Sequence, residues 1–526
     1  MNKVRTFNII PPTLFLGLAT ALSAVFGVYR DHLLAKTFGA TAGDGIYNLD
    51  VYYAAFRIPD LLYKLLIFGT ISAAFIPIFT QYKRDGKMKD AWSFASSMLH
   101  LTLVGVLIIA GGTYFLAPYA VHLVAGGFTD AQLELTVQLM RILLVSPILF
   151  AVSSVIMSIQ DSFKCFFFRS LAPILYNIGI IAGIMYFATD FGVVGVTYGV
   201  LIGAALQLLF QLPAFWQVGY KHYWILGWKR KDVRKAFLLI GPRMLGLSLH
   251  QISMLVNTLI ASFLMTGSIT VFYLAENLQL LPLSVISISF AITSFASLSE
   301  LASEEDTKPF TDKLRKVLQQ VLFLTIPATV GLLILRNYII EVIFVSGKFS
   351  ATDAALTSDV LGYLLVGLFA ISMIPILSRG FYAYHNTKIP LLASATGAGV
   401  GVGGSLLSAF VFGWGIEGIA MSHSFGAIVN CVILYVFAHK KLGYDLLDWG
   451  NVVKMVVVAL IMGVLTSSLK AILPFEGDFI SKITVLGILV LTGAVLYFIF
   501  AHFFRVPEND LLWRHLFKKM GLVKDK

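Results

Sequence analysis

The sequence predicts an all-α, polytopic membrane protein, and three observations support this fold class. Of the 526 residues, 58% are hydrophobic and only 13% are charged, whereas a soluble domain carries roughly 25% charged residues. Apolar segments of about 20 residues, the length that crosses a hydrocarbon core, recur to the end of the chain. Short basic connections alternate with connections that contain almost no lysine or arginine.

Hydropathy predicts about fourteen transmembrane helices. The first segment continues past a small-residue stretch without a polar break, so we interpret it as a retained helix rather than a cleaved signal peptide. The longest polar connection, 217–235, is too short to be an inserted soluble domain. We expect the helices at residues 12–38, 48–82, 91–118, 132–159, 170–188, 193–216, 236–264, 269–299, 316–335, 354–383, 387–412, 416–438, 450–472 and 480–503.

The distribution of positive charge predicts the topology. The net charge is +11, and the basic residues concentrate in alternate connections such as 83–89 and 229–235 and in the carboxy-terminal tail. Because loops rich in lysine and arginine remain in the cytoplasm, we expect both termini to be cytoplasmic and the number of spans to be even. The sequence contains no motif for nucleic-acid binding, so the charge indicates no such partner.

A faint internal repeat relates two parts of the chain. Pro59 in the second predicted helix matches Pro282 in the eighth (282 − 59 = 223), and at the same offset Gly203 falls on Gly426. The repeat predicts two pseudo-symmetric six-helix bundles plus two carboxy-terminal helices, an arrangement that commonly holds a substrate between its halves. The predicted parts are an amino-terminal lobe at 1–216, a cytoplasmic linker at 217–235, a carboxy-terminal lobe at 236–439, and helices thirteen and fourteen with a basic cytoplasmic tail at 440–526.

Charged side chains occur inside two of the apolar segments. Arg30 and Asp31 lie within the first, and Asp50, Arg57 and Lys64 follow at intervals of seven residues in the second. This interval places the last three on one helix face. A charge in hydrocarbon costs about 3 kcal/mol or more unless it faces a bundle interior or a wet cavity, so we expect this stripe to face inward. Its two cationic groups, with Arg30 nearby, suggest a cavity that binds an anion.

Two acidic residues have alternative interpretations. Glu276 is a lone acid in an apolar segment, and it is either part of a functional site or a structural partner of Arg30 or Arg57. Asp60 lies three residues after Arg57 and four before Lys64, so it is expected to pair with one of them.

Sequence motifs for cofactors are absent. The glycines at 399–404 match GxGxxG, but they lie inside an apolar span with no preceding strand, so they predict close helix packing rather than dinucleotide binding. The two cysteines, Cys165 and Cys431, are too far apart in sequence to indicate a metal site. Isolated histidines such as His423 are expected to pack, with a proton relay as the alternative. We therefore expect no cofactor and no metal.

Several segments, taken in order, resemble a known family. They are R-D-x-x-x-A-x-x-F-G-A at 30–40, AFRIPDLLYKLL at 55–66, LAPILYN at 171–177, YLAENLQLLP at 273–282 and SRGFYAYHNTKIP at 378–390. In their order and spacing the chain resembles the MurJ/MviN family, the bacterial lipid II flippases of the multidrug/oligosaccharidyl-lipid/polysaccharide exporter superfamily.

The resemblance implies a fourteen-helix fold with a cationic central cavity and a groove for a lipid tail made by the last two helices. The cavity arginine of the family falls on Arg30, its acid early in helix two on Asp50, a basic position on Lys64, and the acid of helix eight on Glu276. The chain also departs from the pattern. It has uncharged residues where the family pattern has charged ones, namely Ala24, Tyr63, Phe68, Asn277 and Leu280.

From the residues and the resemblance together, we expect a flippase of the bacterial cytoplasmic membrane and not an enzyme. Its expected cargo is lipid II, the undecaprenyl-diphosphate-linked peptidoglycan precursor, moved from the inner to the outer leaflet by alternating access. The predicted substrate-binding residues are Arg30, Asp50, Arg57, Lys64 and Glu276. The predicted conformational residues are Asp31, Asn277 and the helix-bending prolines Pro59 and Pro282.

The expected partners are the bilayer and the lipid-linked glycan, for a protein that acts as a monomer. Coupling to a monovalent cation or to the membrane potential is left open. Three alternatives remain: a flippase for another lipid-linked oligosaccharide of the O-antigen or capsule type, a cation-coupled drug exporter, and a membrane glycosyltransferase. The basic stripe argues against the exporter, and the short extracytoplasmic loops argue against the glycosyltransferase.

Overall fold

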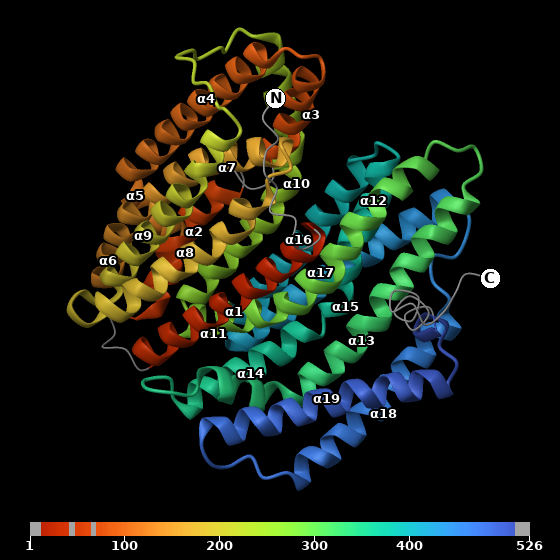
Figure 1. The fold of residues 1–526 in the computed structure, drawn as a ribbon. Helices are drawn as coiled ribbons and strands as arrows, with labels where there is room; N and C mark the ends of the chain where they lie inside the picture. The colour runs from red at the N-terminus through yellow and green to blue at the C-terminus, as the bar shows by residue number, and fades with distance from the viewer. Residues whose placement is uncertain (1–11, 42–47, 65–69, 511–526) are drawn as a thin grey trace. The chain divides into compact units, whose positions relative to one another are not determined.

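The computed structural model describes residues 12–41, 48–64 and 70–510, and every regular element in these ranges is a helix (Figure 1). Packing divides the chain into two units. Unit 1 comprises Met1–Thr270 with Ser346–Asp353, and unit 2 comprises Val271–Val345 with Ala354–Lys526. The two units are described separately below.

Unit 1 holds the helices of the amino-terminal half of the chain. One of its core clusters joins α3, α4, α7 and α10 and contains several aromatic rings. Phe75, Phe79 and Phe94 are fully buried there, with the ring centroids of Phe75 and Phe94 5.3 Å apart. The helices are α1 (Pro12–Phe38), α2 (Leu49–Leu62), α3 (Thr70–Arg84), α4 (Met88–Phe115), α5 (Ala117–Ala125), α6 (Asp130–Leu143), α7 (Val145–Ser162), α8 (Phe166–Tyr186), α9 (Ala188–Gln217) and α10 (Lys231–Ser262).

Unit 2 is built around the long helix α13, which packs against α15, α18 and α19. Phe323 of α13 and Leu434 of α17 are fully buried in its core. The elements are α11 (Ser268–Pro282), the π-helix η2 (Leu283–Ile288), α12 (Ser289–Leu301), α13 (Lys308–Phe344), α14 (Ala351–Leu365), α15 (Leu368–Ala383), α16 (Lys388–Phe410), α17 (Gly415–Leu442), α18 (Trp449–Ile472) and α19 (Phe479–Phe503).

The helices occur where hydropathy predicts them, but some are interrupted. Residues 132–159 form α6 and α7, and residues 354–383 form α14 and α15, which are bent by 44°. Residues 48–82 contain α2 and α3, with 65–69 outside the described residues. A hydropathy window averages over about 19 residues, so a break of one or two residues escapes it. The helix α5 has only nine residues, fewer than the roughly 20 of a membrane span, so a search for spans assigns it to a connection.

The structure confirms an all-α membrane protein. Among the described residues, ten helices or continuous helix pairs are long and apolar enough to cross a membrane, and the bent pair α14–α15 makes eleven. The number fourteen stays a prediction.

The repeat is visible in the helix boundaries. α7 begins at Val145 and α15 begins at Leu368, which are separated by the same 223 positions as the two prolines. A π-helical turn also follows each proline: residues 63–64 after Pro59, and η2 after Pro282. Because π-turns widen a helix locally and are frequent at functional sites, their recurrence supports a shared architecture of the two halves.

The packing units and the repeat divide the chain at different places. The repeat makes α10 the first helix of the carboxy-terminal lobe, yet α10 packs on α3 and α5 of unit 1. The lobe boundaries drawn from the sequence therefore stay a prediction.

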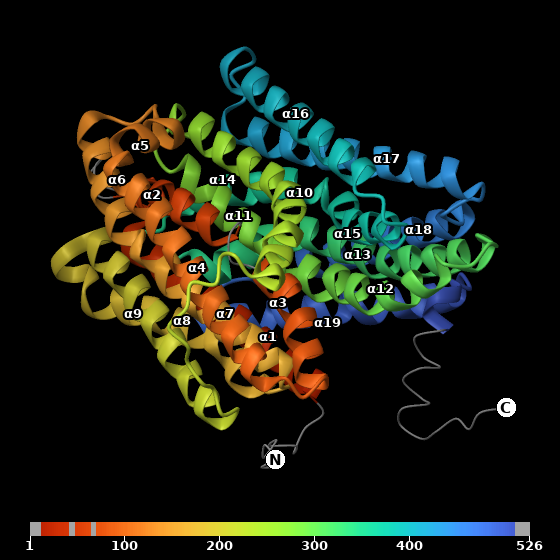
Figure 2. The ribbon, with the colours of Figure 1, turned by 90° about the horizontal axis from the view of Figure 1, so that it is seen from above.

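Of the glycines at 399–404, Gly404 is used for close helix packing, as predicted, whereas a Cβ atom on Gly399 or Gly403 would meet nothing within 4 Å. These glycines lie in α16, which runs beside α17 (Figure 2). A Cβ atom on Gly404 would come within 2.9 Å of the Ser422 hydroxyl, and one on Gly426 within 2.5 Å of the Gly397 carbonyl oxygen. Only glycine at such positions lets the two helix backbones approach this closely.

Candidate functional site

Arg30 of α1 is held by two polar neighbours inside unit 1. Its Nε and one terminal nitrogen donate to Asp31 Oδ1 at 3.0 and 2.8 Å, and the other donates to Asn177 Oδ1 of α8 at 3.2 Å. The Arg30 side chain is 16% exposed and that of Asp31 is 6% exposed. Asp31, predicted to act in conformational change, therefore neutralises the neighbouring arginine. An anionic ligand of Arg30 would have to share it with this carboxylate.

Asp50 fixes a chain turn that is distant in the sequence. It lies in the first turn of α2, is 3% exposed, and accepts hydrogen bonds from the Gly267 amide at 2.7 Å and the Thr270 amide at 2.8 Å. The Thr270 hydroxyl donates to it as well, at 2.6 Å. Three donors satisfy a buried carboxylate well. Asp50 thus anchors the turn between α10 and α11, and its predicted contact with substrate stays a prediction.

Asp353 forms a similar anchor that the sequence analysis missed. It is fully buried and accepts from the amides of Ala40 and Thr41 at 3.3 and 3.1 Å and from the Thr41 hydroxyl at 2.5 Å. Its own turn is a reciprocal cap, in which the Ser350 amide donates to Asp353 and the Asp353 amide donates to the Ser350 hydroxyl oxygen, both at 3.0 Å. The spacing Ser-x-x-Asp is the signal that predicts this cap, but no local signal predicts the contact with Thr41.

The remaining residues of the basic stripe follow α2 toward its end. Lys64 Nζ lies 2.8 Å from Asp60 Oδ2, which confirms the predicted pairing of Asp60. The Lys64 side chain is 43% exposed, whereas Arg57 is half-buried and Pro59 is buried. The stripe therefore runs from a buried acid to an accessible cation. Whether Arg57 and Lys64 contact a ligand stays a prediction.

Glu276 and His423 come together in unit 2, although the sequence analysis considered them separately. Glu276 lies in α11 and is 8% exposed. Phe272, one turn earlier, meets the His423 ring of α17 edge-on with ring centroids 6.2 Å apart, and Glu276 acts electrostatically on His423. Asn277 beside it is half-buried. The proposed pairings of Glu276 with Arg30 or Arg57 stay untested.

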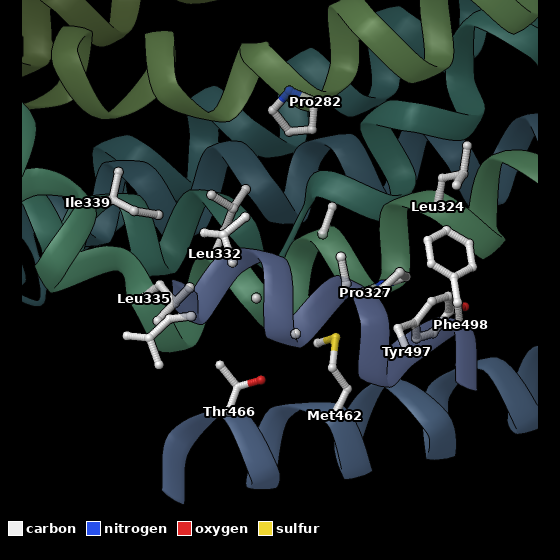
Figure 3. A pocket seen from close by; sticks show the side chains of 16 residues that line it. Pro282, Leu324, Pro327, Leu332, Leu335, Ile339, Met462, Thr466, Tyr497 and Phe498 are labelled. Carbon is white, nitrogen blue, oxygen red and sulfur yellow. The ribbon is translucent and has the colours of Figure 1, made fainter. Parts of the chain in front are cut away.

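An apolar groove lies between α13, α18 and α19, with a volume of about 370 Å³ (Figure 3). Pro282, a predicted conformational residue, lines it from the side of α11. The Tyr497 hydroxyl donates to the Phe323 carbonyl oxygen at 2.9 Å, so its polar end is satisfied and the groove stays apolar. The labelled lining residues include Leu324, Leu332, Leu335, Ile339, Met462, Thr466 and Phe498.

Comparisons with known proteins agree on one family. The model of the family described as "Lipid II flippase MurJ" matches residues 34–487. A "Probable lipid II flippase MurJ" from Buchnera aphidicola subsp. Acyrthosiphon pisum (strain APS) is 30% identical over 509 residues, covering 92% of this chain and 98% of the relative. Another protein of that name, from Vibrio cholerae, is 31% identical over 442 residues, covering 81% of this chain and 82% of the relative.

Solved structures give the same result. The lipid II flippase MurJ in an inward closed conformation has a TM-score of 0.77 and 26% identity, covering 95% of this chain and 100% of that structure. An inward-facing multidrug resistance transporter of the MATE family shares the fold alone, with a TM-score of 0.68, 16% identity, and coverage of 84% and 96%. These are transporters rather than enzymes. The family match spans well over half of the chain, and the chain therefore belongs to the lipid II flippase MurJ family.

Proposed function

We propose that this protein moves lipid II from the inner to the outer leaflet of the bacterial cytoplasmic membrane. The observation that carries the proposal is the match to the MurJ family model over residues 34–487. The groove between α13, α18 and α19 supports it, because an apolar channel beside a membrane-spanning helix suits a prenyl chain. We assign the tail of the lipid to this groove.

The diphosphate of lipid II requires cationic partners, and we assign this role to Arg30 with Arg57 or Lys64. Arginine suits it because its planar guanidinium binds phosphate oxygens in pairs. The sugar hydroxyls require water during transfer, since each polar group stripped of hydrogen bonds in an apolar medium costs several kcal/mol. We assign supporting positions at the head group to Asp50 and Glu276.

The orientation we propose places the basic connections and both termini in the cytoplasm. Movement of an anionic head group outward is then favoured by an inside-negative potential, by about 2.3 kcal/mol per charge per 100 mV. Coupling to this potential or to a monovalent cation is the energy source that we propose, for a protein that acts as a monomer.

Alternating access is the mechanism that we propose, with Pro59 and Pro282 as bending points. Each proline removes an intrahelical hydrogen bond and is followed by a π-turn, so helix α2 and the α11–α12 run have weakened points at matching positions. Asp31 would act by holding or releasing Arg30, to which it is hydrogen-bonded. We also assign a role in the conformational change to Asn277, which is next to Glu276 in the chain.

The test is a flipping assay in bacterial cells depleted of their own lipid II flippase and supplied with this gene. Lipid II in the outer leaflet is measured by its cleavage with an externally added toxin. The wild-type protein should restore cleavage, Arg30→Ala should abolish most of it, and Arg84→Ala, which removes a 79% exposed cation, should behave as wild type. Absence of cleavage with well-expressed wild-type protein would overturn the proposal and favour another lipid-linked oligosaccharide.

A further inference from the structure

One end of the apolar groove carries a cluster of cations and aromatic rings. On α13 the lining residues end with Leu335 and Ile339, and on α18 they end with Thr466. The next turn of α18 brings Lys470 to this end of the groove. The opposite end of the groove is bounded by aromatic side chains, Tyr497 and Phe498. The groove is therefore amphipathic along its length, with positive charge at one end.

Lys470 is fixed against α13. Its Nζ donates to the Ile334 carbonyl oxygen at 2.9 Å and lies 4.3 Å from the centroid of the Tyr338 ring. Tyr338 is itself stacked on Phe475, with ring centroids 3.6 Å apart and an angle of 9° between the rings. This packing restricts a side chain that would otherwise sample many rotamers, so the ammonium group is held near the groove.

Charge balance distinguishes Lys470 from its cationic neighbours. Lys482 Nζ lies 2.7 Å from Glu341 Oε1, and Arg336 lies 3.6 Å from Asp359 Oδ1. In the part of the chain that the structure describes, Lys470 makes no ion pair with a carboxylate. The ammonium group of Lys470 donates one hydrogen bond to a carbonyl oxygen and faces an aromatic ring. An ammonium group has three donor hydrogens, so it can also donate to an anion.

We propose that Lys470 binds the phosphate of a polyprenyl-phosphate lipid whose chain occupies the groove. The inference rests on the proposed function for its choice of lipid and adds a second phosphate contact, separate from Arg30. Apolar lining and a terminal cation match a ligand with an apolar chain and one anionic end.

The groove is not lined by bulky side chains throughout. Small residues from facing helices line its middle: Ala328 and Gly331 on α13, and Gly493 and Ala494 on α19. A Cβ atom on Gly331 would meet no other atom within 4 Å, so space lies directly above this backbone. The methyl branches of an isoprenoid chain therefore find room beside these small residues, and the choice of a prenyl chain over an ordinary phospholipid rests on the proposed function.

The test measures lipid binding by the purified full-length protein in lipid nanodiscs, with undecaprenyl phosphate as the probe. Lys470→Gln should weaken binding about tenfold, since a hydrogen bond between charged groups is among the stronger ones. Lys470→Arg, which keeps the charge, should bind as wild type. Lys454→Gln is the matched control, because it removes an exposed lysine from the first part of the same helix.

Three outcomes decide the proposal. Weaker binding with Lys470→Gln alone supports it. Equal binding by wild type and Lys470→Gln overturns it and leaves Lys470 as an interfacial lysine. Displacement of undecaprenyl phosphate by an equal amount of phosphatidylglycerol also overturns it, because the groove would then hold ordinary phospholipid. The probe carries no sugar and is not transported in this assay, so a failure of the flipping assay with intact Lys470-dependent binding would count against the proposed function only.

Discussion

The hairpins α8–α9 and α16–α17 lie at repeat-related positions, and both bring their two helices together at glycines, but the hydrogen bond between Asn177 of α8 and Arg30 belongs to the first hairpin. Both depend on glycine: a Cβ atom on Gly203 would lie 2.4 Å from the Tyr176 carbonyl oxygen, and one on Gly426 would lie 2.5 Å from the Gly397 carbonyl oxygen. In α8, Asn177 accepts a hydrogen bond from Arg30. At the repeat-related positions the chain has Val400 and Ser253. The comparison teaches that both hairpins use glycine for close packing, whereas the Asn177–Arg30 hydrogen bond has no counterpart at Val400 and Ser253.

The largest expected effect comes from breaking the close helix packing at Gly203 and Gly426, which both hairpins share. Gly203→Leu and Gly426→Leu should each prevent correct folding, because their side chains would overlap a backbone carbonyl that cannot move aside. Overpacking of a core typically costs about 1–3 kcal/mol, and more when backbone must shift. Thermal melting of the purified proteins in detergent measures the effect. Gly403→Leu is the matched control in α16, since its Cβ would have no neighbour within 4 Å. A normal melting temperature for either hairpin variant would contradict the packing argument.

The next largest effect distinguishes two acids at repeat-related positions. Asp353→Ala should lower stability by about 3 kcal/mol, because it leaves the buried donors of Ala40 and Thr41 without their acceptor. Asp130→Ala, at the matching position of α6, should change stability by less than about 0.5 kcal/mol because Asp130 is exposed. Melting temperatures of both variants test this. Equal shifts would show that the Asp353 contacts contribute little.

A smaller effect is expected where the hairpins differ. Asn177→Leu removes the hydrogen bond from Arg30 to the Asn177 side chain and keeps the contact of Arg30 with Asp31. Flipping should fall about tenfold, the equivalent of one lost hydrogen bond to a charged group. Val400→Leu at the repeat-related position should leave flipping unchanged. The toxin-cleavage assay measures both, and unchanged flipping by Asn177→Leu would mean that this contact is not needed to position Arg30.

The smallest effect concerns the ion pair between Asp60 and Lys64, which has no counterpart at the repeat-related positions. A double-mutant cycle with Asp60→Asn and Lys64→Gln should give a coupling energy below about 1 kcal/mol, because the Lys64 side chain is 43% exposed. High salt should reduce the coupling further. The repeat-related residues are Leu283 and Ser287, so no equivalent pair exists there. A coupling energy well above this value would indicate that the pair is shielded from water in the working protein.

Much of the fold was predictable because local properties determine it. The predicted segments 12–38, 450–472 and 480–503 agree within one residue with α1, α18 and α19. Their boundaries follow from the change from apolar to polar sequence, which hydropathy detects directly. Breaks such as the one between α14 and α15 were not predictable in this way, since a single bend barely alters the average hydropathy of the segment.

The candidate site was predictable as a set of residues but not as a set of contacts. The interval of seven placed Asp50, Arg57 and Lys64 on one helix face, yet Asp50 is bonded to a turn more than two hundred residues away. In the same way, Phe272, one turn before Glu276, meets the ring of His423 from a helix about 150 residues further along the chain. Helical periodicity gives the face on which a side chain lies, but the partner on that face depends on which helix packs there.

The sequence by itself determined the membrane class, the approximate helix positions, the repeat and the family. Each follows from composition, apolar length or motif order, which act locally along the chain. Tertiary structure alone decided that Asp50 and Asp353 anchor distant turns, that Arg30 is bonded to Asn177, and that α13 forms one wall of the apolar groove with α18 and α19. These contacts join segments far apart in the chain, and packing selects them because a buried polar group must find a partner wherever the fold provides one.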